Sequence, residues 1–217
     1  MLQRRFIHLI NVLSGREFFH RNKHNSRQLW KRSLVFIPWY IIGVVFAIMD
    51  LFFVGYLTQA IMQVTQRNGR KLTPRELELF SELTQDASYL KTVHVYERSW
   101  VAKVGAWLIR KNTLGLGLAN TIHFNREIDI EKSASDCRWL VHEVAHTLQF
   151  KYRGLIYIPE SLVAQQFSGY SFGGRKTLKR AKKLRVFNPE QQADMFVVLQ
   201  LSEFESVIRE DIKKGNW

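Results

Sequence analysis

The chain has 217 residues, which is enough for one domain with an appendage. Its formal net charge is +13, but residues 1–32 hold eight Lys and Arg against one Glu, and residues 175–185 hold seven Lys and Arg and no acid. From residue 58 onward, basic and acidic residues outside that second run are equal in number, and no nucleic-acid-binding motif occurs, so we expect no nucleic acid partner. The single cysteine, Cys137, excludes an intramolecular disulfide.

A long apolar run at residues 33–57 follows the basic N-terminal segment 1–32. The run contains one charged residue, Asp50, and about 20 apolar residues are enough to cross the hydrocarbon core of a bilayer. We therefore predict a single transmembrane helix over 33–57. The alternative is a hydrophobic hairpin buried in a soluble core. A cleaved signal peptide is disfavoured, because the basic leader is too long and no small-x-small cleavage site follows.

Basic residues on the two sides of this run favour one orientation. Lys31 and Arg32 directly precede it, whereas the first basic residue after it is Arg67. Because Lys and Arg are preferentially retained in the cytoplasm, we expect a cytoplasmic N-terminus and a second domain on the other side of the membrane. Further basic residues at positions 70, 71 and 75 leave the opposite topology open.

A linker is predicted at residues 58–72, followed by a domain over 73–217. The domain opens with Thr73-Pro74-Arg75-Glu76, a helix-start signature with a capping Thr and a Pro in the first turn. Gly115 and Gly117 lie in an alternating apolar stretch, where they weaken a strand but let another backbone approach closely. The β-type runs of the domain are at 92–96, 104–109 and 113–124.

The stretch from 139 to 150 predicts an amphipathic helix that carries His142-Glu143-Val144-Ala145-His146, the pattern His-Glu-x-x-His. Residues four apart on a helix share a face, with Cβ atoms about 5–6 Å apart, so both imidazoles can bind one zinc ion. Glu143 would lie beside that ion and could accept a proton from a bound water. The alternative is that the two histidines lie on an ordinary packed helix.

A catalytic zinc site needs a third protein ligand and one open position. Asn188-Pro189 predicts a helix start, which places Glu190 in the first turn and Asp194 one turn later on the same face. We predict Glu190 as the third ligand and Asp194 as the acceptor of a ligating histidine's N–H. Two alternatives stay open: Glu190 only interacts with the helix dipole, or His123 is the third ligand.

The segment Glu190-Gln191-Gln192-Ala193-Asp194 reads Glu-x-x-Ala-Asp, and together with His-Glu-x-x-His it resembles the paired signature of gluzincins, which include membrane-bound CAAX-prenyl and heat-shock-type zinc endopeptidases. Residues 73–200 are more similar to uncharacterised zinc peptidase-like proteins associated with the Vgr and Rhs proteins of bacterial secretion systems. In those proteins the motif is followed by a Gln, here Gln149, by a Tyr/Gly-rich segment, here 169–174, and by Asn-x-Glu-Gln-Gln-Ala, here 188–193.

This resemblance implies an α+β fold: a zincin-like minidomain with a small sheet, the His-Glu-x-x-His helix and the Glu-x-x-Ala-Asp helix, here preceded by a single transmembrane helix. It also implies Zn²⁺ as cofactor, a peptide or protein substrate bound along the strand that precedes the metal helix, at 113–124, and secretion-system proteins as partners. With the apolar run, we expect a single-pass protein of the bacterial inner membrane.

The expected function is a membrane-anchored zinc metallopeptidase in which Glu143 is the general base and Tyr157 or Tyr170 donates to the oxyanion. Two alternatives remain: a zinc-stabilised binding module without turnover, and a toxin effector linked to a Vgr/Rhs-type system. The basic run 175–185 is expected to form a helix, which either contacts acidic lipid headgroups or is simply solvated.

Overall fold

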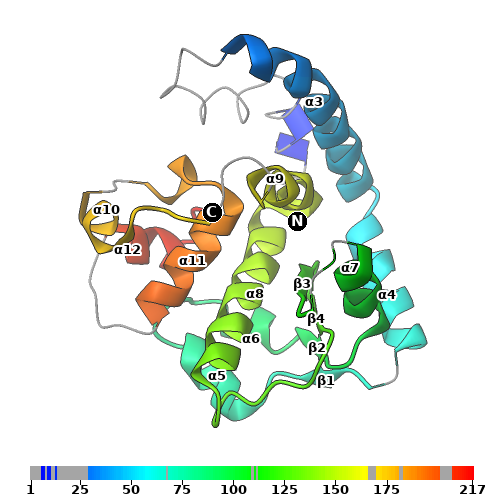
Figure 1. The fold of residues 1–217 in the computed structure, drawn as a ribbon, viewed down its shortest axis with the longest axis vertical. Coiled ribbons are helices and arrows are strands. Elements are labelled where there is room, and N and C mark those ends of the chain that lie inside the picture. The colour runs from blue at the N-terminus through cyan, green and yellow to red at the C-terminus, as the bar shows by residue number, and fades with distance from the viewer. Residues whose placement is uncertain are drawn as a thin grey trace.

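A computed structural model of the chain describes these residues: 6–7, 9–10, 13, 29–66, 68–108, 110, 112–165, 170–180, 183–200 and 207–217. Most of the predicted basic segment 1–32 therefore lies outside the described residues. In the described part the fold is α+β, as expected, with a small mixed sheet beside a long central helix (Figure 1).

The apolar run does not form the single straight helix predicted over 33–57. Helix α3 spans Leu29–Leu51 and α4 spans Val54–Thr65, and the chain turns by 71° between Tyr40–Leu51 and α4. The turn is at Phe53, whose φ of 58° lies in the left-handed region. In the described residues, no helix taken alone has the length and apolar content of a membrane span, and only this bent pair meets both criteria together.

One side of the bent pair packs on the domain. Ala47 contacts the buried Ile156, and Gly55 lies so close to Phe150 that a Cβ at position 55 would be 2.8 Å from its ring. Asp50 is 3% exposed and lies against Gly154, where an added Cβ would meet the carboxylate. These contacts make α3 and α4 part of the folded unit. Residues 58–65, which we expected in a linker, continue α4.

The sheet has four strands in the order β1-β2-β4-β3. Strands β1 and β2 are antiparallel, β2 and β4 are parallel, and β3 and β4 form an antiparallel hairpin, so β3 is an edge strand. The long strand predicted over 113–124 is thus two strands, joined at Ala119 with φ of 53°. The strand bounds are Arg70–Lys71 (β1), His94–Tyr96 (β2), Gly115–Leu118 (β3) and Thr121–Phe124 (β4).

The prediction of a β-type run at 104–109 is wrong. Residues 104–108 lie in helix α7, Trp100–Leu108. Helix α7 buries Ala102 and Ala106 and packs on β4. Small residues four apart give a flat surface that sits closely on a strand, and this tertiary contact outweighs the β preference of Val and Trp.

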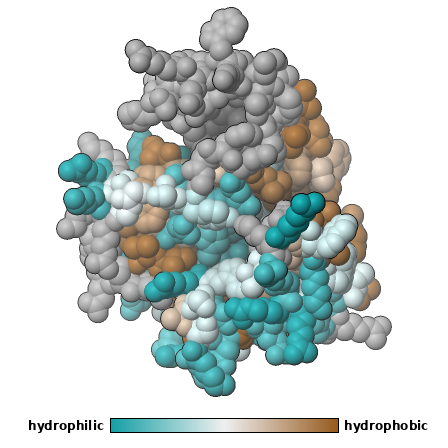
Figure 2. All heavy atoms as spheres, viewed as in Figure 1, coloured by the Kyte–Doolittle hydropathy of each residue, from teal (hydrophilic) through white to brown (hydrophobic). Residues whose placement is uncertain are grey.

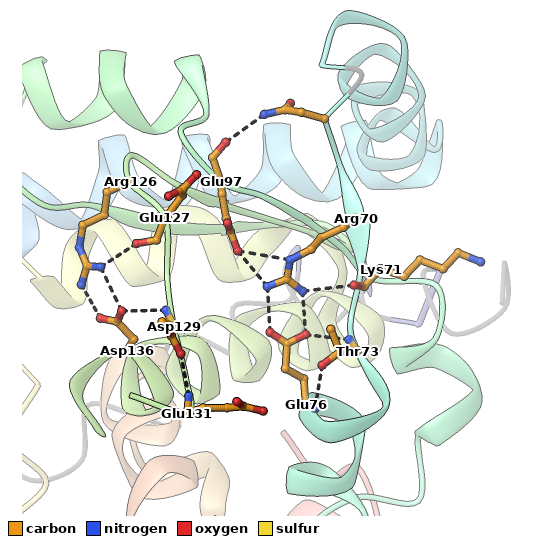
Figure 3. A network of polar contacts seen from close by, with 11 residues as sticks. Arg70, Lys71, Thr73, Glu76, Glu97, Arg126, Glu127, Asp129, Glu131 and Asp136 are labelled. Atoms are coloured by element: carbon orange, nitrogen blue, oxygen red, sulfur yellow. Dashed lines mark hydrogen bonds and ion pairs between the residues drawn. The ribbon is translucent and has the colours of Figure 1, made fainter. Parts of the chain in front are cut away.

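Two short helices precede β2, and the first has the predicted cap. Helix α5, Pro74–Phe80, begins at Thr73, whose hydroxyl accepts from Glu76 N–H while the Glu76 carboxylate accepts from Thr73 N–H. Arg70 binds both Glu76 and Glu97, so it ties β1 to α5 and to the chain after β2 (Figure 3). The second helix, α6, spans Ala87–Leu90.

Helix α8, Ala134–Arg153, carries the His-Glu-x-x-His motif and is buried along most of its length. Its N-cap is Ser133, whose side chain accepts from Asp136 N–H, and Asp136 itself binds the Arg126 guanidinium and accepts from Asp129 N–H (Figure 3). The helix ends at Arg153 and is capped by Gly154, whose φ of +67° few other residues adopt. The 3₁₀ turn η2 and helix α9 follow directly; their bounds are Gly154–Ile156 and Tyr157–Val163.

The C-terminal helices cover the other side of α8. The predicted helix beginning at Asn188 is α11, Pro189–Gln200, and residues 175–180 of the basic run lie in α10, Gly174–Arg180. Phe196 of α11 stacks on Phe80 with 6.0 Å between ring centroids, within a core that α8 shares. The 3₁₀ turn η4, Leu184–Val186, lies between α10 and α11. Helix α12, Val207–Lys213, follows α11.

Candidate metal centre

Helices α8 and α11 bring three metal-ligand side chains to one point. Nε2 of His142 lies 3.2 Å from Nε2 of His146 and 3.3 Å from Oε2 of Glu190, and Nε2 of His146 lies 3.6 Å from Oε1 of Glu190. Among the described residues, these three form the group that could hold a metal ion. Glu190 lies 44 positions after His146 in the sequence, and the packing of α11 on α8 brings its carboxylate to the two imidazoles.

The spacing of these donors fits a tetrahedral ion. Four ligands about 2.1 Å from a zinc-sized cation are separated from one another by about 3.4 Å, close to the three measured distances. The donor set has two imidazole nitrogens and a carboxylate oxygen. All three side chains are at least 86% shielded from solvent, so an ion there would interact with fixed donors rather than bulk water.

Each histidine is held through its second ring nitrogen. Nδ1 of His142 lies 3.0 Å from Oδ1 of Asp194, and Nδ1 of His146 lies 2.8 Å from Oε1 of Gln149. These acceptors require Nδ1–H tautomers, which leave both Nε2 atoms free to coordinate an ion. Burial lowers the pKa of His142, but the hydrogen bonds to Asp194 and Glu190 outweigh it and raise this pKa to about 10, so an ion that binds at Nε2 has to displace a proton from it.

Gln149 contacts the candidate centre, and sequence analysis assigned it no role of its own there. Its Nε2 donates to the Pro189 carbonyl at 2.9 Å and to Oε1 of Gln192 at 3.1 Å. Gln149 therefore links His146 to the first turn of α11, from which Glu190 projects. Its position three residues after His146, on the same helix face, was the available signal.

Glu190 is fully buried and held by neighbours from two elements. Its Oε1 accepts from Nε2 of Gln165, at 3.0 Å, and its backbone lies in the first turn of α11, where Oδ1 of Asn188 caps Gln191 N–H. Burial raises the pKa of Glu190, but the two adjacent histidines outweigh it and hold the pKa well below its usual range. The carboxyl group is therefore an anion, as a metal ligand must be.

Glu143 lies beside the donor group under strand β3. An added Cβ at Gly115 would be 2.6 Å from Oε1 of Glu143, and one at Gly117 would be 2.7 Å from Cβ of His146. Only glycine allows the strand to lie this close to the motif helix, which explains both glycines. Burial raises the pKa of Glu143 above its usual range, and the histidines oppose this. A carboxylate with a raised pKa is suited to accept a proton.

The two candidate tyrosines have different surroundings. Tyr157 is buried, stacks on His146 with 6.0 Å between centroids, and donates its hydroxyl to the Gly117 carbonyl at 2.5 Å. Tyr170 is 38% exposed, and its ring lies 6.0 Å from that of His142. Burial raises the pKa of both hydroxyls, so both are neutral donors. The structure thus leaves Tyr170 as the better candidate to reach a ligand, because Tyr157 already binds the backbone.

His123 is not part of the donor group. Its Nδ1 lies 3.0 Å from the Ser99 hydroxyl and its Nε2 lies 2.9 Å from the Thr121 hydroxyl, so both nitrogens have partners. The ring is fully buried and stacks on Tyr96 at 5.0 Å, and burial lowers its pKa to about 4. The alternative that His123 supplies the third donor is therefore wrong. It is a neutral core residue of the sheet.

A cavity of about 690 Å³ opens onto the centre. Its walls come from edge strand β3, from α9 and from α11, and the motif face of α8 lies between them. Apolar residues supply much of the lining, whereas the three donor residues, Glu143, Asp194 and Tyr170 supply polar groups; the apolar part is Leu108, Leu114, Leu116, Leu118, Trp139, Ile158, Leu162 and Val197. A cavity of this kind is typical of a binding site.

Comparison of the chain with protein-family models, with curated proteins and with solved structures finds no match in any of the three.

Proposed function

We propose that the protein is a membrane-anchored zinc metallopeptidase of the gluzincin type, with a zincin-like catalytic domain. The observation that carries the proposal is the convergence of three donors, from His142, His146 and Glu190, at the floor of a cavity, with the Glu143 carboxylate beside them. Two imidazoles and one carboxylate, each of the imidazoles oriented by an outer acceptor, form a ligand set typical of catalytic zinc.

His142, His146 and Glu190 would hold the zinc ion, which would supply Lewis acidity and lower the pKa of a bound water to about 7. Glu143 would accept a proton from the attacking water and pass it to the leaving amine of the substrate. Asp194 and Gln149 hold the two imidazoles in the tautomer that leaves Nε2 available. Tyr170, on the solvent side of the cavity, donates its hydroxyl to the oxygen of the scissile carbonyl as negative charge develops on it.

The edge strand β3 is the element along which we place the substrate. Its outer edge has no strand neighbour in the described sheet, where β4 is its one partner, and an extended peptide can add to such an edge beside the Gly117 carbonyl, which already accepts from the Tyr157 hydroxyl. Strand β3 lines the cavity from Gly115 to Leu118, so a peptide added to it would cross the donor group. A peptide or protein is therefore the proposed substrate, and secretion-system proteins are proposed partners on the resemblance given above.

The proposed anchor is the bent pair α3–α4. It has length and apolar content enough to enter a bilayer as a pair, although it is not a straight span. Between residues 40 and 65, the one charged residue is Asp50, which is buried against the domain rather than exposed to lipid. A bacterial inner membrane is the proposed location.

The variant Glu143→Gln tests this function. It removes the proton acceptor while keeping size and polarity, so the full chain should keep its zinc and lose peptide hydrolysis by about 10²–10⁴-fold. The matched control is Glu78→Gln, whose side chain is 68% exposed, and it should change neither quantity. Hydrolysis that survives in Glu143→Gln contradicts the mechanism. If the unmodified chain binds zinc but cleaves no peptide of a random library, the protein is a non-catalytic zinc module.

A further inference from the structure

Helix α7 turns large apolar side chains to solvent, although its other face is packed. Ala102 and Ala106 are buried, whereas Trp100 is 52% exposed and Trp107 is 76% exposed. Val104 and Leu108 are exposed on the same face, since positions 100, 104, 107 and 108 lie on adjacent turns of one side of a helix. Exposed apolar patches of this kind mark an interaction surface.

The bent pair α3–α4 carries a second exposed apolar stripe. Its exposed positions are spaced three or four residues apart on each helix, so they lie on the faces turned away from the domain. No charged side chain interrupts the stripe, because Asp50 is buried. The exposed large residues of the stripe are Ile41, Val45, Ile48, Phe52, Phe53, Leu57, Ile61 and Val64.

Helix α4, which carries part of the stripe, lies on the same side of the sheet as α7. Figure 1 and Figure 3 both show α4 and α7 beyond the sheet, on the side away from α8. In Figure 2 the edge of the molecule formed by α3 and α4 is largely hydrophobic. A membrane or partner surface that covers the exposed stripe of α3 and α4 therefore comes close to α7.

The residue types of α7 favour a lipid surface over a protein partner. Tryptophan is enriched at the boundary between headgroups and acyl chains, where its ring is amphipathic. Lys103 lies on α7 and Arg110 just after it, and both are exposed. A short helix with Trp and Leu on one face and basic residues beside them is typical of an element that lies in the plane of an anionic membrane surface.

We propose that the exposed face of α7, formed by Trp100, Val104, Trp107 and Leu108, lies in the headgroup region of the bilayer in which α3 and α4 are anchored. This inference rests on the anchoring proposed above and not on the metal centre. Gly105 and Leu108 also line the cavity, so this contact places the entrance of the cavity at the membrane surface. The peptide segments that can enter the cavity are then those that lie close to the bilayer surface.

Spin-label accessibility in the full chain tests the contact. On a Cys137→Ala background, single cysteines are placed at Trp107 in α7, at Leu57 in α4, and at Lys132, whose side chain is 86% exposed on the loop before α8. Each labelled chain is reconstituted in vesicles of phosphatidylethanolamine and phosphatidylglycerol. Molecular oxygen concentrates in lipid and a nickel chelate stays in water, so the ratio of their collision rates with the label reports its surroundings.

The expected result is a higher oxygen-to-nickel ratio at Trp107→Cys and Leu57→Cys than at Lys132→Cys, by several-fold. A Trp107 label with the same ratio as Lys132, beside a lipid-exposed Leu57 label, overturns the α7 contact and leaves the anchor intact. Ratios equal to that of Lys132 at both positions overturn the anchoring and the α7 contact together. A Trp107 label shielded from both reagents, with spin–spin broadening that dilution with unlabelled chain removes, identifies a second copy as the occupant and also refutes the proposal.

Discussion

The hydrogen bond between Asp194 and His142 gives a graded prediction for metal affinity. Oδ1 of Asp194 lies 3.0 Å from Nδ1 of His142, and this side chain is 35% exposed, so it orients the imidazole without being part of the core. Removing such an outer acceptor typically weakens metal binding by about 10–100-fold, or about 1.4–2.7 kcal/mol. Asp194→Asn keeps an oxygen that can accept the bond and loses only the charge, so we expect about tenfold. Asp194→Ala loses both, and we expect up to about 100-fold.

The assay is a competition titration of zinc between the full chain and a chelator of known affinity. Because Asp194 is partly exposed and pairs with His142, its substitution should leave the far-UV circular dichroism of the zinc-loaded chain unchanged. The exposed Glu78→Gln variant serves again as the control for a lost surface charge. Equal zinc affinity of Asp194→Ala and the unmodified chain would refute the idea that this acceptor positions His142.

Two further predictions concern the elements that position the site. Gly117→Ala places a methyl group 2.7 Å from Cβ of His146, so we expect it to lower the free energy of unfolding by about 1–3 kcal/mol and to reduce hydrolysis, and urea unfolding with unchanged stability would contradict the close strand–helix packing. The Arg126 hydrogen bond lowers the pKa of Asp136 to about 2, so its contribution is fully present above about pH 4 and is lost as the pH falls through about 2. We expect Asp136→Asn to cost about 1–3 kcal/mol at neutral pH and much less at pH 2, where half of the Asp136 carboxyl is protonated in the folded chain, and an equal cost at both would show that the charge is unimportant.

Much of the site could be predicted because its signals are local. The four-residue spacing of His142 and His146 places them on one face of any helix, and Asn188-Pro189 predicts where α11 begins. Whether Glu190 reaches the histidines depends on how α11 packs on α8, which no local pattern encodes. The contacts of Gln165 with Glu190 and of Gln149 with α11 depend on the same packing.

The incorrect fold predictions have physical causes of the same kind. The turn after α3 has no Gly or Pro, and Phe53 adopts a left-handed conformation that bulky residues rarely take, so the sequence reads as one uninterrupted helix. Val104 and Trp107 are β-preferring residues but lie in a helix, because Ala102 and Ala106 pack on β4. In both places tertiary contacts outweigh local preference.

The central claim is that two imidazoles and one distant carboxylate bind a single zinc ion, leaving one coordination position for water. Zinc X-ray absorption of the metal-loaded full chain tests it most directly. We expect one zinc per chain with four nitrogen or oxygen ligands at about 2.0–2.2 Å, two of them imidazoles, and no sulfur ligand. In Glu190→Ala we expect one protein ligand fewer and weaker binding. A chain that binds no zinc, or that binds zinc as tightly without the Glu190 carboxylate as with it, would contradict the account.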